Sequence, residues 1–163
     1  MYVDFIYLCE RISKQKAMYE ATPIIEGIPI GNEKDDIKTR EEIITTKYVQ
    51  WRNSNPEGKV FNDDLNDFIY VKYLSLDETR RHAAKRYLST LAVFYLDRIL
   101  KTAIRIGKPV PIKKRSKNQK SFSKMIHMEC QLETIGVVKL MVGIKKKTGE
   151  KIQYCLTALE QEQ

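Results

Sequence analysis

The sequence predicts an α+β fold, in which N-terminal helices precede one long helix that packs on a C-terminal antiparallel sheet. Apolar side chains recur every three or four residues over 76–106, which is the spacing of a helix with one buried face. Three later segments, 126–133, 137–145 and 152–158, alternate apolar and polar residues, as the strands of a half-buried sheet do. Glycines stand in the breaks between these segments, so the three strands should form a β-meander.

We expect the chain to have two parts, an N-terminal helical segment over 1–55 and an α+β domain over 56–163. A weak helical pattern covers residues 3–20. The stretch TPIIEGIPIG that follows it contains two prolines and two glycines, which favour an extended linker.

A second helix is predicted over 40–53, where apolar residues return at helical spacing. Thr39 and Glu42 have the spacing of an N-terminal capping box for this helix. The stretch NSNPEG should end it, because it combines several turn-forming residues. A short extended piece over 59–61 and a strand over 68–73 should follow.

The long helix over 76–106 should begin at another capping box, formed by Ser75 and Glu78, and end near Gly107. Residues 107–123 are a polar, basic loop with two prolines, long enough to be functional or disordered. The apolar face of the meander should cover the helix, and the polar face should stay open. The open face gathers His127, Glu129, Gln131, Lys139, Gln153 and Thr157.

Charge is distributed unevenly along the chain. Residues 1–75 carry 13 acids and 10 bases, whereas residues 76–163 carry 8 acids and 19 bases. No acid occurs from Arg98 to Met128. Such a basic field attracts polyanions, and nucleic acid is the commonest of them. We therefore expect RNA or DNA as a partner, with RNA preferred, and as its contacts Arg80, Arg81, Lys85, Lys113, Lys114, Arg115, Lys117, Lys120 and Lys124.

Two histidines are candidates for catalysis. His127 and Glu129 lie on the predicted open face with lysines, and such a set suits general acid–base cleavage of RNA. His82 stands in ETRRHAAK near the predicted helix start, where a helix N-terminus and arginines would hold phosphate. A solvated sheet face and a solvated basic helix face are the alternative interpretations. Phe122, in the basic loop, should either stack on a base or anchor the loop.

Several classes of protein are disfavoured by what the sequence lacks. It has no P-loop, no dinucleotide-binding glycine pattern, no nucleophile elbow and no HExxH. Its three cysteines form no CxxC and are expected to be reduced, as in a cytoplasmic protein. The N-terminus does not have the pattern of a signal peptide, and no apolar run is long enough for a membrane span. We expect no cofactor, no metal and no membrane association.

The order of the predicted elements, together with one short motif, resembles a known family. The segment GKVFNDDLNDFIYVKYLSLDETRRHAAK leads into a helix, a polar loop and a three-stranded meander. This arrangement resembles the barnase–EndoU–colicin–RelE-like domains found in polyvalent proteins of phages and conjugative elements. The resemblance covers about residues 55–160. The matching residues are Lys59, Val60, Asn62, Leu65 and His82.

The resemblance implies a metal-independent endoribonuclease of a mobile element, with RNA laid across the sheet. His82 would be the family's histidine, and Thr79 would stand for the small hydroxyl residue before it. The family often ends its last strand with a histidine, whereas this chain has Cys155, Thr157 and Glu160 there. This departure leaves room for a relative that binds without cleaving. The alternative function is a non-catalytic accessory protein that docks an acidic protein partner through its basic surface.

Overall fold

A computed structural model describes residues 27–159, so the helix expected over 3–20 lies outside the described residues. The helices are α2 (Lys34–Ser54), α3 (Tyr73–Ala83), α4 (Tyr87–Ala92) and α5 (Leu96–Thr102), with the 3₁₀ turns η1 (Val93–Tyr95) and η2 (Lys117–Gln119). The strands are β1 (Lys59–Asn62), β2 (Asp67–Tyr70), β3 (Ile104–Arg105), β4 (Val110–Pro111), β5 (Phe122–Leu132), β6 (Gly136–Lys145) and β7 (Lys151–Ala158).

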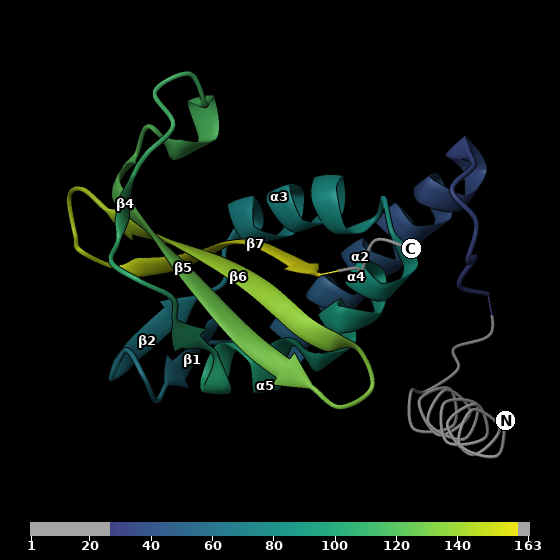
Figure 1. Cartoon of the computed structure of the whole chain (residues 1–163), viewed down its shortest axis with the longest axis horizontal. Coiled ribbons are helices and arrows are strands. Elements are labelled where there is room, and N and C mark those ends of the chain that lie inside the picture. The colour runs from purple at the N-terminus through teal and green to yellow at the C-terminus, as the bar shows by residue number, and fades with distance from the viewer. Residues whose placement is uncertain (1–26, 160–163) are drawn as a thin grey trace, which may run out of the picture.

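All seven strands belong to one sheet, which confirms the α+β class (Figure 1). Its order is β1-β2-β7-β6-β5-β3, and β4 also pairs with β5. The meander of β5, β6 and β7 is antiparallel, as predicted. The β1–β2 hairpin joins it through a short parallel pairing of β2 with β7, in which Ile69 faces Lys151 and Tyr70 faces Ile152.

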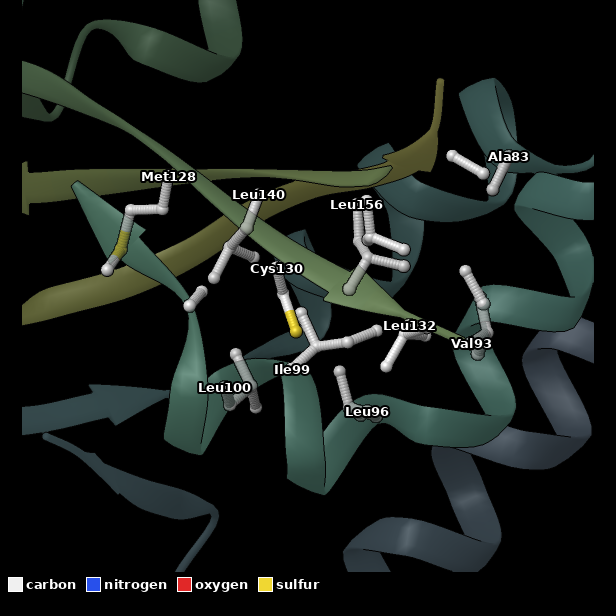
Figure 2. Close-up of a cluster of buried hydrophobic side chains, with 14 of the residues drawn as sticks. Ala83, Val93, Leu96, Ile99, Leu100, Met128, Cys130, Leu132, Leu140 and Leu156 are labelled. Atoms are coloured by element: carbon white, nitrogen blue, oxygen red, sulfur yellow. The ribbon is translucent and has the colours of Figure 1, made fainter. Parts of the chain in front are cut away.

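The main core lies between the helices and one face of the meander. Figure 2 shows Leu96, Ile99 and Leu100 of α5 beneath side chains of the meander strands, of which Leu140 and Leu156 are fully buried. Helix α2 adds Ile44 and Tyr48 to the same cluster, and α4 adds Leu91 and Ala92. Burial of this many apolar side chains is the main favourable contribution to folding.

The single helix expected over 76–106 is wrong, because the structure divides this stretch into α3, α4, η1 and α5. The first break is stabilised by Arg40 of α2, which is fully buried. Its Nε donates to the Ala84 carbonyl at 2.7 Å, and Nη2 donates to the Lys85 carbonyl at 3.2 Å. In a continuous helix these carbonyls would accept hydrogen bonds from backbone amides one turn later, and at the break Arg40 takes the place of those donors. The backbone of Arg86, which follows, is extended.

The C-terminal end of this helical stretch is likewise stabilised by a side chain from a distant part of the chain. Helix α5 stops at Thr102, and the buried Asn62 of β1 donates from Nδ2 to the carbonyls of Leu100 (2.8 Å) and Ala103 (3.0 Å). Its Oδ1 accepts from the Leu65 amide at 2.7 Å. Asn62 and Leu65, which belong to the family-like motif, therefore have a structural role at this point.

Both predicted capping boxes are misplaced. Helix α2 begins at Lys34, and the box at its start is formed by Glu33 and Asp36 rather than by Thr39 and Glu42. The first turn was missed because its charged residues carry no apolar periodicity.

Helix α3 likewise begins earlier than predicted, at Tyr73 with Lys72 as its N-cap. Ser75 is therefore inside the first turn, where its Oγ accepts from the Lys72 amide at 3.0 Å. Glu78, one turn further on, therefore does not cap the helix, and its carboxylate contacts Arg81 and His82 instead. The strand predicted over 68–73 is correspondingly shorter, since β2 ends at Tyr70.

A β-bulge in the β6–β7 ladder changes which residues of β7 face the helices. Met141 pairs with Cys155, but its neighbour Val142 pairs with Gln153, so Tyr154 is the extra residue. Gln153 is consequently buried against α2 and α3, and its predicted place on the open face is wrong. It accepts at Oε1 from the Tyr48 hydroxyl (3.0 Å) and donates from Nε2 to Thr79 Oγ1 (3.0 Å).

The opposite face of the sheet is not uniformly polar and open. Phe122, Met125, Ile152 and Tyr154 form a second buried cluster there, against which Ile112 of the basic loop packs. Residues 107–123 are thus partly ordered by β4, η2 and the start of β5. Of the two roles proposed for Phe122, the structure supports the anchor, because its ring is 1% exposed and packs edge-on against Tyr154.

We expect Gln153→Ala to lower the free energy of unfolding by about 1–3 kcal/mol, because Tyr48 and Thr79 would lose a buried hydrogen-bond partner. Urea denaturation followed by circular dichroism measures this change. Gln131→Ala, at an exposed position of β5, is the matched control and should change stability little. Equal effects of the two substitutions would contradict the structural role of Gln153.

Candidate nucleic-acid cleft

A cleft of 590 Å³ lies between the C-terminal half of α3, the basic loop and strands β6 and β7. Three segments that are far apart in the sequence therefore meet at one place. In Figure 1 the loop with η2 stands out from the sheet on the same side as α3. The residues that line the cleft are Glu78, Arg81, His82, Lys113, Ser116, Lys117, Asn118, Gln119, Met141, Tyr154, Cys155 and Thr157.

Helix α3 is placed beside the cleft by the pairing of β2 with β7. The chain leaves β2 parallel to β7, turns at Val71 and Lys72, and continues as α3 along the same strand. Ser75 Oγ then donates to the Gln153 carbonyl at 2.5 Å, which fixes the helix against the strand. The next turn brings Glu78 beside Cys155, whose Sγ lies 3.9 Å from the Glu78 carbonyl oxygen.

Glu78 is the centre of the polar contacts in the cleft, although its side chain is only 4% exposed. Its Oε2 is 3.4 Å from His82 Nε2, and its Oε1 is 3.5 Å from Arg81 Nη1. Asn118 of the loop donates from Nδ2 to the same carboxylate. Residues three and four positions apart share one face of a helix, so Glu78, Arg81 and His82 all point toward the loop.

The basic loop is held over the second apolar cluster by its own side chains. Gln119 is buried, and its Oε1 accepts from the Lys113 amide at 2.8 Å. Tyr154 lies beneath this segment, and burial is the main cause that raises the pKa of its hydroxyl, against hydrogen bonds with Ser116 and Gln119 that lower it. Lys113 and Lys117 are exposed at the rim.

Cys155 lies on the floor of the cleft in an environment that disfavours a thiolate. Burial, and secondly the negative charge of Glu78, raise the pKa of the Cys155 thiol to about 12. At neutral pH this side chain is therefore a neutral thiol.

Four of the residues predicted to bind nucleic acid or to catalyse its cleavage meet in the cleft: Arg81, His82, Lys113 and Lys117. The others do not line it. Arg80 points elsewhere and pairs with Asp77 at 2.9 Å. Lys114, Arg115, Lys120 and Lys124 are exposed on the loop and on β5, and Lys85 is exposed beyond the end of α3.

His127 and Glu129 lie on the same face of the sheet as Met141 and Cys155 but outside the cleft. His127 pairs with Met141, which lines the cleft and in turn pairs with Cys155, so one strand spacing, roughly 5 Å, separates His127 from the cleft lining, and two separate it from Cys155. His82 lies on α3, beyond Cys155. Of the two candidate histidines, His82 lines the cleft and His127 does not.

The position of His82 within its helix differs from the prediction. Arg80, Arg81 and His82 occupy the last turn of α3, not its first, so no helix N-terminus contributes to phosphate binding here. Thr79, proposed as the hydroxyl residue of the site, is fully buried between Tyr48 and Gln153 and faces away from the cleft.

Sequence reasoning missed the role of Glu78, Asn118 and Tyr154. The spacing of Glu78 and His82, four residues apart on a helix, was a usable signal, but the carboxylate was assigned to a capping box. No local pattern indicates Asn118 or Tyr154, because the fold alone brings them to α3.

No family model, no curated protein and no solved structure matches the chain. The site must therefore be interpreted from its own residues. Within residues 27–159 there is no group of three or more His, Cys, Asp or Glu side chains placed to hold a metal ion. No helix in this described part is both long and apolar enough to cross a membrane.

We expect Cys155 to resist alkylation by iodoacetamide in the folded protein. With its pKa raised to about 12, the reactive thiolate forms only as the pH approaches that value. In urea, where an ordinary thiol titrates near 8.5, labelling at pH 8.5 should be on the order of 1,000-fold faster. Peptide mapping by mass spectrometry measures both rates.

The same protection should depend on the neighbouring carboxylate. Glu78→Gln removes the negative charge beside Cys155 and should speed labelling of the folded protein. Equal labelling rates for folded and unfolded protein would contradict this description of the cleft floor.

Proposed function

We propose that the protein binds RNA in the cleft between α3 and the basic loop and cleaves it without a metal ion, with His82 as the acid–base group. The observation that carries the proposal is the contact of His82 with the nearly buried Glu78, 3.4 Å apart, beside Arg81, Lys113 and Lys117. A histidine oriented by a carboxylate and surrounded by cations has the components that phosphodiester cleavage requires. The stretch from Arg98 to Met128, which contains basic residues and no acid, would also attract the negatively charged RNA backbone.

In this proposal, Glu78 acts as a positioning residue. It holds His82 at Nε2, which leaves Nδ1 of the half-exposed ring to take the proton of a ribose 2′-hydroxyl. The 2′-oxygen then attacks the adjacent phosphorus, and the bond to the 5′-oxygen breaks to give a cyclic phosphate. Tyr154, a phenol that is protonated at neutral pH, is the donor that the cleft offers to the leaving oxygen.

The cations stabilise the negative charge that develops on the phosphate. Arg81 is positioned by Glu78 at 3.5 Å and offers planar, paired N–H groups to phosphate oxygens. Lys113 and Lys117 approach from the loop on the other side of the cleft. The exposed Lys114, Arg115, Lys120 and Lys124 extend this basic surface beyond the cleft.

The same basic surface also supports a second function, the docking of an acidic protein partner. Outside the cleft, the exposed cations of the loop could dock an acidic protein without any catalysis. Nucleic-acid binding is favoured because the cations border a cleft that also contains a histidine–carboxylate pair.

We expect the purified protein to cleave labelled RNA in the presence of EDTA, and His82→Ala to slow cleavage by about 10²–10⁴-fold, the usual contribution of an acid–base group. His127→Ala is the matched control, because this exposed histidine lies on the same sheet but outside the cleft. It should retain wild-type activity. Intact RNA with the wild type, or full activity in His82→Ala, would overturn the catalytic proposal.

RNA binding should weaken steeply with salt, and Lys113→Glu with Lys117→Glu should reduce the slope of log K against log[salt] by about 1.4 for a single strand. The control is Lys34→Glu with Lys38→Glu, an equal change of charge at exposed positions of α2. If the control and the cleft variants behaved alike, binding would depend on net charge alone. An absence of RNA and DNA binding would favour the acidic protein partner.

A further inference from the structure

We infer that the exposed face of the β1–β2 hairpin is a base-stacking platform, and that the substrate is therefore single-stranded RNA. This inference rests on the proposed function and names the substrate class of the same protein surface. Its basis is an exposed aromatic pair, Phe61 and Phe68, with a lysine over one ring, on the same face of the sheet as the cleft. Neither phenylalanine takes part in the cleft itself.

The two rings are placed on this face by the alternation of the hairpin. Val60 and Ile69 pair with each other and pack into the main core beneath the sheet. Their neighbours Phe61 and Phe68, which also pair, must point to the opposite face. Tyr70, two residues beyond Phe68, lies on that face too.

Both rings of the aromatic pair are partly exposed to solvent. Phe61 is 41% exposed and Phe68 is 37% exposed, and their centroids lie 5.3 Å apart in an edge-to-face arrangement. Lys59 Nζ lies 4.3 Å from the centroid of Phe68 and 5.8 Å from that of Tyr70. Aromatic rings next to cations bind successive bases by stacking and the backbone by charge.

The platform lies on the same face of the sheet as the proposed RNA site, beside the second cluster. Tyr70 pairs with Ile152 and packs against the second cluster, whose member Tyr154 lines the cleft. A strand held at His82 would pass along the outside of the basic loop to reach the hairpin.

Two of the acids near the hairpin are engaged by cations. Asp64 accepts from the Arg105 backbone amide and from Arg105 Nε, both at 2.9 Å, and Asp67 accepts from Lys151 Nζ at 2.7 Å. These hydrogen bonds lower the pKa of both carboxyl groups and leave their charges balanced locally. Two further acids near the hairpin, Glu57 and Asp63, are exposed, and Glu57 lies 4.0 Å from Lys59.

Stacking on both rings requires unpaired bases, because the bases of a duplex offer no free faces between their neighbours. The platform therefore distinguishes single strands from duplexes, whereas the cations of the cleft and loop attract both. This distinction gives the inference a readout separate from cleavage.

The test uses fluorescence anisotropy with a fluorescein-labelled 2′-O-methyl oligonucleotide of about 12 nucleotides, which cannot be cleaved, and with its duplex. We expect Phe61→Leu and Phe68→Leu each to weaken binding of the single strand about tenfold, since leucine keeps the apolar volume but has no aromatic face. Duplex binding should not change. Phe61→Tyr and Phe68→Tyr should retain single-strand binding.

Phe94→Leu is the matched control, because Phe94 also lies under a lysine, with Lys47 Nζ 4.4 Å from its centroid, but belongs to η1 on the helical side. It should bind as the wild type does. If the wild type bound neither oligonucleotide, the proposed function would fail. If the wild type bound the single strand and Phe61→Leu and Phe68→Leu bound it equally well, the platform alone would be refuted. Equal losses for single strand and duplex would also refute it.

Discussion

The β-bulge at Tyr154 is the constraint on which both the core and the cleft depend. It places Gln153 inward, where the side chain connects α2 to α3 through Tyr48 and Thr79. It also places Tyr154 on the opposite face, at the floor of the cleft. In a ladder without the bulge, Gln153 would point to the cleft side of the sheet and Tyr154 would point to the helices. The one inserted residue therefore both stabilises the helices and builds the cleft.

Most of the sheet could be predicted from the sequence, because its signal is local. The meander strands alternate apolar and polar residues and are separated by glycine-containing turns, and both features survive in the structure. The bulge could not be predicted, since an inserted residue leaves the alternation of Ile152, Tyr154 and Leu156 unchanged in the sequence. Only the pairing with β6 reveals that Leu156 faces the main core while Ile152 and Tyr154 face the second cluster.

The broken helix has a comparable explanation. Apolar spacing over 76–106 persists through the breaks, because each short helix buries one side against the same core. The breaks depend on Arg40 and Asn62, which come from distant parts of the chain and bond to carbonyls that the sequence cannot show to be free. For the same reason the cleft was only half predicted: the basic loop and His82 were evident from composition, but their meeting with Glu78 was not.

The parallel pairing of β2 with β7 has a consequence for how the chain folds. Ile69 pairs with Lys151, so the β1–β2 hairpin and the start of α3 have no strand to dock on until residues 151–158 have been synthesised. Contacts between such distant segments slow folding, because a large loop must close before they form. On the ribosome, the side of α3 that packs on β7 therefore stays uncovered until β7 emerges, and exposed apolar surface of this kind makes a nascent chain prone to aggregation.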